Sequence, residues 1–556
     1  MDKRVVGAIA LSIAVLFAFR YYEEHYLANL AKQPPPITRP VPVTPAPVPP
    51  PVTQPPPEPI TSLPAEESVP GRQVVIEGDL YRAVLDNRGG ILSSWQLRQY
   101  KAVKGEIFDM IPTAHMEQRP FPGSLIFDDA AMTTLANQEN YAVEIVSGSE
   151  TPSGLAAPAT VVMRLRRGDV IIEKRFQFEA ANYVLHLSTT LQRGNQSLRG
   201  RILLGQDIGA EPEHLLNASL KLMAVSDLGG KIQRDAGPKD ENEKSIPGAV
   251  QWVGLDMQYF AEIAIPAQPI ESFVIQRKPV QTLGLTGEAM TRDLIRVAVP
   301  ADGSAAYTIY LGPKMQTYLA AVPGADISGV IDYGMWSIIV KPLLLGLEFI
   351  NRYTHNYGTA IVALTLVLSL ALFPVRLKQM MSMKKMAVIQ PKVKEIQEKY
   401  KRYKKTDPKR AEMNQEVMAL YKEHKVNPLG GCLPMLLQMP LLFAFYRLLA
   451  SSIELRQAPF FGWLHDLSAK DPYYVLPIIM GITMLISQKM TPMAPSTDPT
   501  QAKMMMIMPV VMTVFFLNVS SGLNLYFLCS NVFQIAFQKV AERWVGDKRS
   551  GRKARN

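Results

Sequence analysis

Residues 358–375, GTAIVALTLVLSLALFPV, form an apolar run without a single charged side chain. A helix needs about 20 predominantly apolar residues to cross the hydrocarbon core of a bilayer. Four further apolar runs follow at residues 433–449, 474–488, 504–519 and 523–538. Together the five runs predict a membrane-embedded α-helical bundle over residues 351–540.

The part of the chain before this bundle differs in composition. Residues 1–20, with Lys3 and Arg4 ahead of an apolar stretch, are interpreted as a sixth transmembrane helix, a retained N-terminal anchor. Residues 21–71 are rich in Pro, which predicts an extended tether that cannot bury a core.

Residues 72–325 show short runs of alternating apolar and polar side chains, such as 161–166 and 170–178. The turn pair Gly168-Asp169 separates these two runs, and further turn signals lie at residues 87–90, 229–230 and 302–303. This pattern predicts a large antiparallel β-sandwich domain.

The distribution of charge predicts the topology. Asp332, Lys341-Pro342 and Glu348 interrupt the apolar run within residues 326–350, which favours an amphipathic helix in the outer interface over a seventh span. Residues 376–430 and the tail 541–556 are rich in Lys and Arg, which accumulate on the cytoplasmic side. Six spans therefore predict cytoplasmic N- and C-termini and a periplasmic β-domain.

The basic loop 376–430 carries two apolar stripes of helical spacing. The first consists of Ile389, Val393, Ile396, Tyr400 and Tyr403, and the second of Met413, Val417, Leu420 and Tyr421. Asp407-Pro408 between them favours the start of a new helix. We expect two short helices paired as an antiparallel cytoplasmic hairpin.

Several polar side chains interrupt the predicted spans and are candidates for lining a polar groove: Thr365, Ser369, Gln438, Asn518, Asn524 and Tyr526. Thr365 and Ser369 lie four residues apart, on one helix face. The alternative for each hydroxyl is a bond to its own backbone or a contact that joins two helices. Several such residues in otherwise apolar helices favour a groove that is wet from the cytoplasm.

Specific motifs join these features to a known family. Residues 425–434 read KVNPLGGCLP, with QMP at 438–440, ELRQAPF at 454–460, WLHDLS at 463–468, DPYY at 471–474 and SGLNLYF at 521–527. They resemble the YidC/Oxa/Alb family, in its Gram-negative type. The residues that carry the first motif are Asn427, Pro428, Gly430, Gly431 and Pro434.

The resemblance implies a membrane protein insertase and chaperone, not an enzyme, in the bacterial inner membrane. It would insert and help to fold inner-membrane proteins through a hydrophilic groove, alone or with the Sec translocon. It implies a β-supersandwich for the periplasmic domain, and it places Thr365, Tyr526 and Phe527 against the entering substrate helix. Many family members carry an arginine where this chain has Ser369, and Arg376 lies near the cytoplasmic end of its span. We therefore expect an uncharged groove.

The expected partners are nascent membrane proteins, lipids and the Sec translocon, with the ribosome as a candidate for the basic loop and tail. We expect a monomer without a cofactor or metal. A multi-span secondary transporter is the main alternative, since transporters also use polar residues at mid-membrane. The chain shows no internal repeat of spans and no Asp, Glu or Arg in the middle of a predicted span, which argues against it. A membrane-tethered carbohydrate enzyme is a second alternative, but five further spans exceed what an anchor needs.

Overall fold

The computed structural model describes residues 69–102, 105–111, 121–205, 222–238, 243–283, 289–403, 407–424, 433–490 and 499–553. The predicted anchor, nearly all of the tether, and the motif residues Asn427, Pro428, Gly430 and Gly431 lie outside these ranges. Strands occupy the described chain from Gln73 to Pro313, and helices dominate from Ser337 to Lys553.

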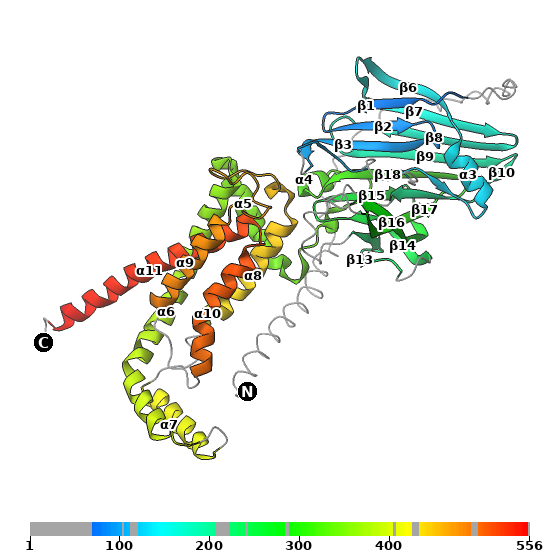
Figure 1. Cartoon of the computed structure of the whole chain (residues 1–556). Helices are drawn as coiled ribbons and strands as arrows, with labels where there is room; N and C mark the ends of the chain where they lie inside the picture. Colours follow the sequence, from blue (N-terminus) through cyan, green and yellow to red (C-terminus); the bar gives the residue numbers. More distant parts are fainter. Residues whose placement is uncertain are drawn as a thin grey trace, which may run out of the picture. The chain divides into compact units, whose positions relative to one another are not determined.

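The strands lie together in one β-rich domain (Figure 1). Eighteen strands are described. They are β1 Gln73–Glu77, β2 Tyr81–Asp86, β3 Ile91–Lys101, β4 Ile107–Asp109, β5 Leu125–Ile126, β6 Ala142–Thr151, β7 Gly154–Arg167, β8 Val170–Phe178, β9 Val184–Arg193, β10 Gln196–Ser197, β11 Arg201–Gly205, β12 Met223–Leu228, β13 Ile232–Asp235, β14 Glu243–Asp256, β15 Phe260–Pro266, β16 Ile270–Leu283, β17 Ala289–Pro300 and β18 Ser304–Pro313.

Antiparallel pairing between consecutive strands dominates this domain. The run β6-β7-β8-β9 is a meander, and β9 then pairs with β18, which pairs with β15 and so joins the first half of the domain to the second. The pairing of β1 with β7 is parallel. The predicted turns at residues 87–90, 168–169, 229–230 and 302–303 all connect consecutive strands, so the β-rich prediction is confirmed.

A buried lysine shows how one predicted turn is tied to the core. Lys174 lies on the inward face of β8, where alternate residues are buried, and its side chain is 0% exposed. Its Nζ donates to the carbonyl oxygens of Gly89, Gly90 and Gly123 at 2.6, 3.1 and 2.7 Å. These acceptors match the three donors of an ammonium group, while burial lowers the pKa of Lys174 to about 7. Gly89 and Gly90 have φ of 76° and 56°, which glycine adopts readily.

Two short helices, α3 and α4, belong to the strand-rich part of the chain, and the longer helices that follow form a bundle. They are α3 Ala130–Gln138, α4 Gln316–Leu319, α5 Ser337–Thr354, α6 Tyr357–Lys399, α7 Lys409–Glu423, α8 Leu433–Ser451, α9 Val475–Met490, α10 Pro499–Phe516 and α11 Ser521–Lys553. Short 3-10 turns lie at Ser328–Val330, Gly334–Trp336 and Ile453–Leu455.

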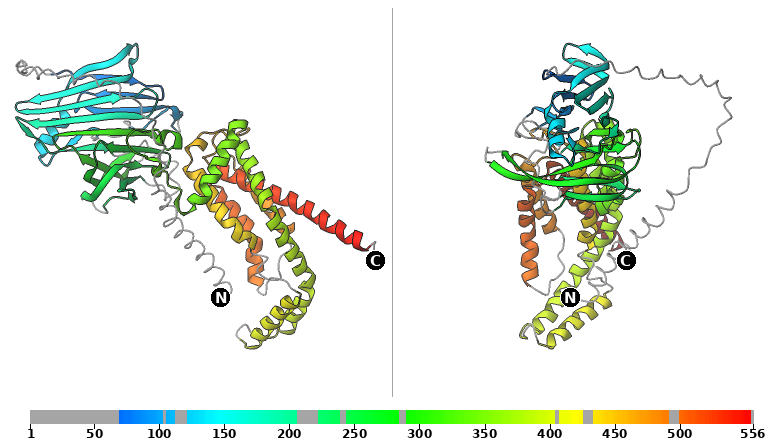
Figure 2. Two further views of the ribbon diagram at one scale, coloured as in Figure 1. Left: turned by 180° about the vertical axis from the view of Figure 1, so that it is seen from behind. Right: turned by 90° about the vertical axis from the view of Figure 1, so that its right-hand side faces the viewer.

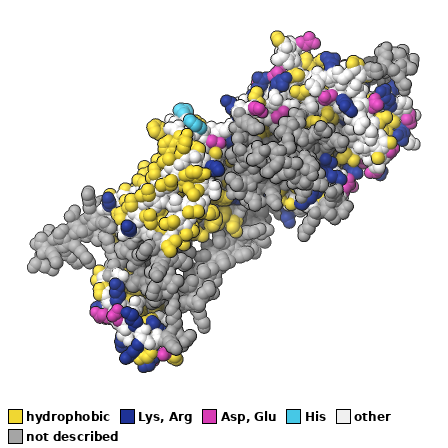
Figure 3. Space-filling view, viewed as in Figure 1, with side chains coloured by type: hydrophobic (Ala, Val, Ile, Leu, Met, Phe, Trp, Pro, Cys, Tyr) yellow, Lys and Arg dark blue, Asp and Glu magenta, His cyan; other side chains and the backbone are white. Residues whose placement is uncertain are grey.

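Two stretches within the described helices are long and apolar enough to cross a membrane, Gly334–Thr354 and Tyr357–Ser382, with mean hydropathies of 1.3 and 2.2. Val475–Met490 and Ile507–Phe516 are shorter apolar helices. Outward-facing apolar side chains crowd α6, α9 and α10: Leu366, Val367, Leu370, Ile478, Ile479, Ile482, Ile486, Ile507, Val510, Val511, Val514 and Phe515. On the face shown in Figure 3, hydrophobic side chains gather over the upper part of the helical bundle with few charges among them, whereas charged side chains gather at its lower end, where the α6–α7 hairpin lies. Such an extended apolar surface is typical of contact with lipid.

The predicted hairpin is present, but its first arm is not a separate short helix. α6 continues through Pro374 and Pro391 as one helix and extends beyond the other helices before it meets α7 (Figure 2). An interior proline removes one backbone hydrogen bond and bends a helix without having to end it. The two arms share a small core of Met386, Ile389, Val393, Val417 and Tyr421.

Candidate functional site in the helical bundle

Three polar side chains from three helices meet inside the apolar bundle. Arg376 of α6 donates from Nη2 to Oε1 of Gln438 in α8 at 3.3 Å, and Gln438 Nε2 donates to the hydroxyl of Tyr526 in α11 at 3.1 Å. The ring of Tyr526 stacks on Phe445, with 3.9 Å between centroids. We call Arg376, Gln438 and Tyr526 the polar chain. It brings together residues 62 and 88 positions apart in the sequence.

Arg376 is not among the residues that the sequence predicts for the groove. It lies two helical turns after Ser369, and therefore on the same face of α6. Its Nη1 is buried and has no hydrogen-bond partner among the described residues. A long side chain lets its charge reach a depth that its position in the sequence does not indicate. Arg376 therefore brings a positive charge beside Gln438, a predicted groove residue, which departs from the expectation of an uncharged groove.

Thr365 and Ser369 continue this face of α6 toward the other end of the bundle. They are 1% and 3% exposed. The hydroxyl of Thr365 donates to the carbonyl oxygen of Ile361 at 2.6 Å, which is the local bond that the sequence analysis gave as the alternative. In this arrangement the two hydroxyl groups are packed between helices.

The predicted residues around the start of α11 divide into two groups. Asn524 is fully buried, and its Nδ2 donates to the carbonyl oxygens of Phe516 and Val519 at 3.2 Å each, so it ties the α10–α11 turn. Asn518 is exposed in that turn. Phe527 instead packs edge-on against Tyr526, at 5.2 Å, next to the polar chain. Pro434 lies in the first turn of α8.

Residues 453–474, the closing loop, cover the end of the bundle where α8 ends and where α6, α9 and α11 begin. Asn356, the N-cap of α6, donates from Nδ2 to the carbonyl oxygens of Pro459 and Phe460. Ser521, the first residue of α11, donates from its backbone N–H to the carbonyl oxygen of Ala469 at 2.7 Å. Gly358 lies so close to the loop that an added Cβ would be 2.1 Å from the Phe460 ring.

Asp471 organises the remainder of the closing loop. It is 1% exposed and accepts hydrogen bonds from Trp463 Nε1 at 3.0 Å and from the backbone N–H groups of Tyr473 and Leu476 at 3.0 and 2.7 Å. The bond to Leu476 satisfies a backbone donor in the first turn of α9. This end of the bundle is therefore closed by a hydrogen-bonded loop. Arg376 and Gln438 lie toward the opposite ends of α6 and α8, whereas Tyr526 lies in the second turn of α11, nearer the loop.

Comparison with known proteins agrees with this architecture. The model of the 60Kd inner membrane protein family matches residues 349–548, and that of the YidC periplasmic domain matches residues 73–345. A membrane protein insertase YidC of Syntrophus aciditrophicus is 34% identical over 97% of this chain and 99% of that protein. One of Geotalea daltonii is 36% identical over 97% of this chain and 98% of that protein.

The crystal structure of an active YidC insertase with its first transmembrane domain resolved aligns with 85% of this chain and 92% of that chain, at 17% identity and a TM-score of 0.36. The chain belongs to the YidC family of membrane protein insertases.

Proposed function

We propose that this chain inserts nascent proteins into the bacterial inner membrane and helps them to fold, by way of a polar groove that includes the polar chain. It acts as an insertase and not as an enzyme. The observation that supports the groove is the chain of contacts from Arg376 through Gln438 to Tyr526 inside an otherwise apolar bundle. Its members come from three helices, as the walls of a groove would.

The physical task is to move a short polar segment across the bilayer while the neighbouring apolar segment enters the lipid. A charged side chain at the bilayer centre costs on the order of 3 kcal/mol on insertion scales. Polar side chains and water inside the bundle shorten the apolar distance and lower that cost. The closing loop then seals the far end until the segment passes.

Arg376 gives the proposed groove a fixed positive charge, although Ser369 stands where many relatives carry an arginine. A partly buried cation attracts carboxylates more strongly than one in water, and the Nη1 group of Arg376 has no hydrogen-bond partner in the described part of the chain. The groove therefore favours substrates whose translocated segment carries Asp or Glu. Thr365, Ser369 and Phe527 are its proposed contacts with the incoming helix.

We further propose the topology that the charge pattern indicates, with six spans, cytoplasmic termini and a periplasmic β-domain. The proposed segments are the anchor 1–20, tether 21–71, β-domain 72–325, interfacial helix 326–350, core 351–540, hairpin loop 376–430 and tail 541–556. Four apolar side chains of α5 are buried, Val340, Leu343, Leu344 and Leu347, while Leu345, Phe349 and Tyr353 are exposed. The exposed side also carries the charged Lys341, which supports an interfacial position.

The proposed partners beyond substrates and lipids are the Sec translocon and the ribosome. A basic and aromatic cluster at the end of the hairpin supports the proposal that the chain binds the ribosome. In this cluster Arg402 and Lys409 lie over the Tyr403 ring at 5.4 and 5.1 Å. Such clusters bind the RNA backbone in a salt-dependent manner. We propose a monomer as the working unit.

Site-specific photocrosslinking tests the groove directly. A photoreactive residue at Thr365, Ser369 or Phe527 of the full chain should crosslink to a short membrane protein during its synthesis. The matched control is Val367, which lies on the opposite side of α6 from Ser369 and is 56% exposed, and which should crosslink to lipid alone. Absence of nascent-chain adducts from all three groove positions would refute the proposal. Ser369→Leu should lower insertion while Val367→Leu leaves it unchanged, and an unaffected Ser369→Leu chain would remove Ser369 from the groove.

A further inference from the structure

Two neighbouring residues of the closing loop form hydrogen bonds with the main chain of the β-rich domain. Gln457 donates from Nε2 to the carbonyl oxygen of Lys101 at 2.7 Å, and its Oε1 accepts from the Lys101 backbone N–H at 3.3 Å. Arg456 donates from Nη2 to the same carbonyl oxygen at 2.9 Å. Lys101 is the last residue of β3, so these bonds extend the edge of the sheet into the loop.

Arg456 also packs against the β-rich domain through its guanidinium plane. That plane lies 5.1 Å from the ring of Phe108 in β4 and 5.3 Å from the ring of Phe260 in β15. The two rings stack on each other with 4.3 Å between centroids. A guanidinium group that combines ring contacts with a hydrogen bond is held in both position and orientation.

The backbone of Gln457 shows that this contact is maintained against local strain. Its φ is 57°, a left-handed conformation that costs a residue with a side chain on the order of 1 kcal/mol. Glycine would adopt this conformation without that cost. The chain has a glutamine here, and its amide pairs with both backbone groups of Lys101, so the surrounding contacts offset the strain.

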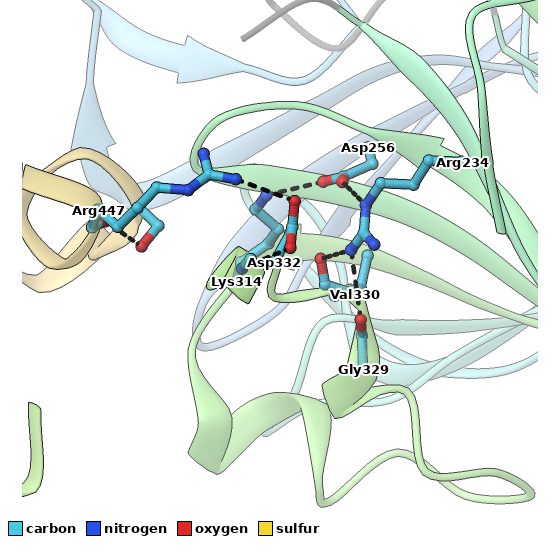
Figure 4. Close-up of polar contacts among 9 residues, drawn as sticks. Arg234, Asp256, Lys314, Gly329, Val330, Asp332 and Arg447 are labelled. Carbon is cyan, nitrogen blue, oxygen red and sulfur yellow. Dashed lines mark hydrogen bonds and ion pairs between the residues drawn. The ribbon is translucent and has the colours of Figure 1, made fainter. Parts of the chain in front are cut away.

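A second connection fixes the end of α8 from the other side (Figure 4). Arg447 of α8 pairs with Asp332 at 3.1 Å. Just before Asp332, the carbonyl oxygens of Gly329 and Val330 accept from Arg234 of β13 at 3.3 and 2.9 Å. Arg234 is in turn held by a buried carboxylate, Asp256, which also pairs with Lys314. The segment between the last strand and α5 is therefore pinned to β13 and to α8.

We propose that the β-rich domain is a buttress that holds the closing loop shut over the outer end of the bundle, with Arg456 and Gln457 as the positioning residues. This inference rests on the proposed function, because it takes the loop end of the bundle as the outer end of the groove. The two residues act through the loop and do not touch the substrate. Releasing them leaves the helices in place but lets the loop open more often.

The test measures how often the outer end opens in the full chain. In a Cys432→Ser, Cys529→Ser background, Ser452→Cys places a thiol where the native side chain is 4% exposed and its hydroxyl has no partner among the described residues. A membrane-impermeant maleimide is added to right-side-out membrane vesicles, and the labelling rate is followed. Gln457→Ala and Arg456→Met should each raise this rate about tenfold, as expected when a local opening loses hydrogen bonds.

Matched controls distinguish loss of the clamp, meaning the contacts of Arg456 and Gln457 with Lys101, from general destabilisation of the chain. Lys101→Ala should label at the parent rate, because the clamp contacts the backbone of Lys101 and not its side chain. Arg164→Met, at a half-exposed ion pair of the β-rich domain, should also leave the rate unchanged. A reporter at Thr189→Cys, 1% exposed in β9, should stay protected in both clamp variants.

Unchanged labelling of the Ser452→Cys reporter in both clamp variants would overturn the inference, and so would an equal rise at the Thr189→Cys reporter. Gln457→Ala removes one half-buried amide, so it keeps the test valid if Arg456→Met fails to fold. Labelling does not depend on insertion. A parent chain that inserts no substrate while the clamp variants still open would refute the proposed function and leave the buttress standing.

Discussion

Replacing Arg376 by methionine tests the charge of the proposed groove. Methionine retains an unbranched stem that packs beside Gln438 but removes the guanidinium group and its bond to Oε1. At an effective dielectric constant of about 20, a carboxylate about 8 Å from that charge gains about 2 kcal/mol, or about thirtyfold. A neutral segment gains nothing from it, so the effect should depend on the charge of the substrate.

The assay compares two versions of one short substrate, with Asp or Asn in the translocated segment, inserted into proteoliposomes that contain the full chain. With the native chain, the ratio of inserted Asp substrate to inserted Asn substrate should be higher than with a chain that lacks the Arg376 charge. Arg376→Met should lower the Asp/Asn ratio about thirtyfold, whereas Arg376→Lys should retain most of it because it keeps the cation. An Asp/Asn ratio that is the same for the native and Arg376→Met chains would refute the reasoning.

Three other changes probe neighbouring parts of the site. Tyr526→Phe leaves a Gln438 amide donor unpaired, which should cost about 1 kcal/mol of unfolding free energy in detergent and reduce insertion modestly; an unchanged melting curve would contradict the bond. Gly358→Ala should destabilise the closing loop by about 2 kcal/mol, since the new methyl group collides with the Phe460 ring, and proteolysis of the loop should report it. Burial raises the pKa of Glu454 from 4.5 to about 7, so the native chain should lose unfolding free energy, by about 3 kcal/mol at most, as the pH rises through that interval. Glu454→Gln should abolish this dependence; a native stability that rises over the same interval would show the sign to be wrong.

The sign for Glu454 follows from proton binding. A carboxyl group whose pKa is higher in the folded chain binds more protons there than in the unfolded chain between pH 4.5 and about 7. The stability that it contributes is present below pH 4.5 and is lost as the pH rises through about 7. Glu454 lies in the 3-10 turn at the start of the closing loop, so the measurement reports on that end of the bundle.

Local patterns in the sequence sufficed for the elements of the fold. The alternation at residues 170–178 predicted β8 with its correct ends, and the glycine turns predicted the connections around it. These signals are local because side-chain direction repeats every two residues in a strand, and because glycine alone adopts many turn conformations readily. The ends of α6 were not predictable in the same way, since an interior proline is compatible with both a kink and an end.

The sequence by itself determined which segments are strands, which are apolar helices and to which family their motifs belong. It also placed Thr365 and Ser369 on one helix face, because helical periodicity depends on neighbouring residues alone. Only the tertiary structure decided that Arg376 reaches Gln438, that Asn524 ties a turn, and that Gln457 grips the main chain of Lys101, 356 positions away. Each of these contacts depends on how far a side chain extends and on which other segment packs opposite, and neither quantity is contained in the spacing of residues along one helix.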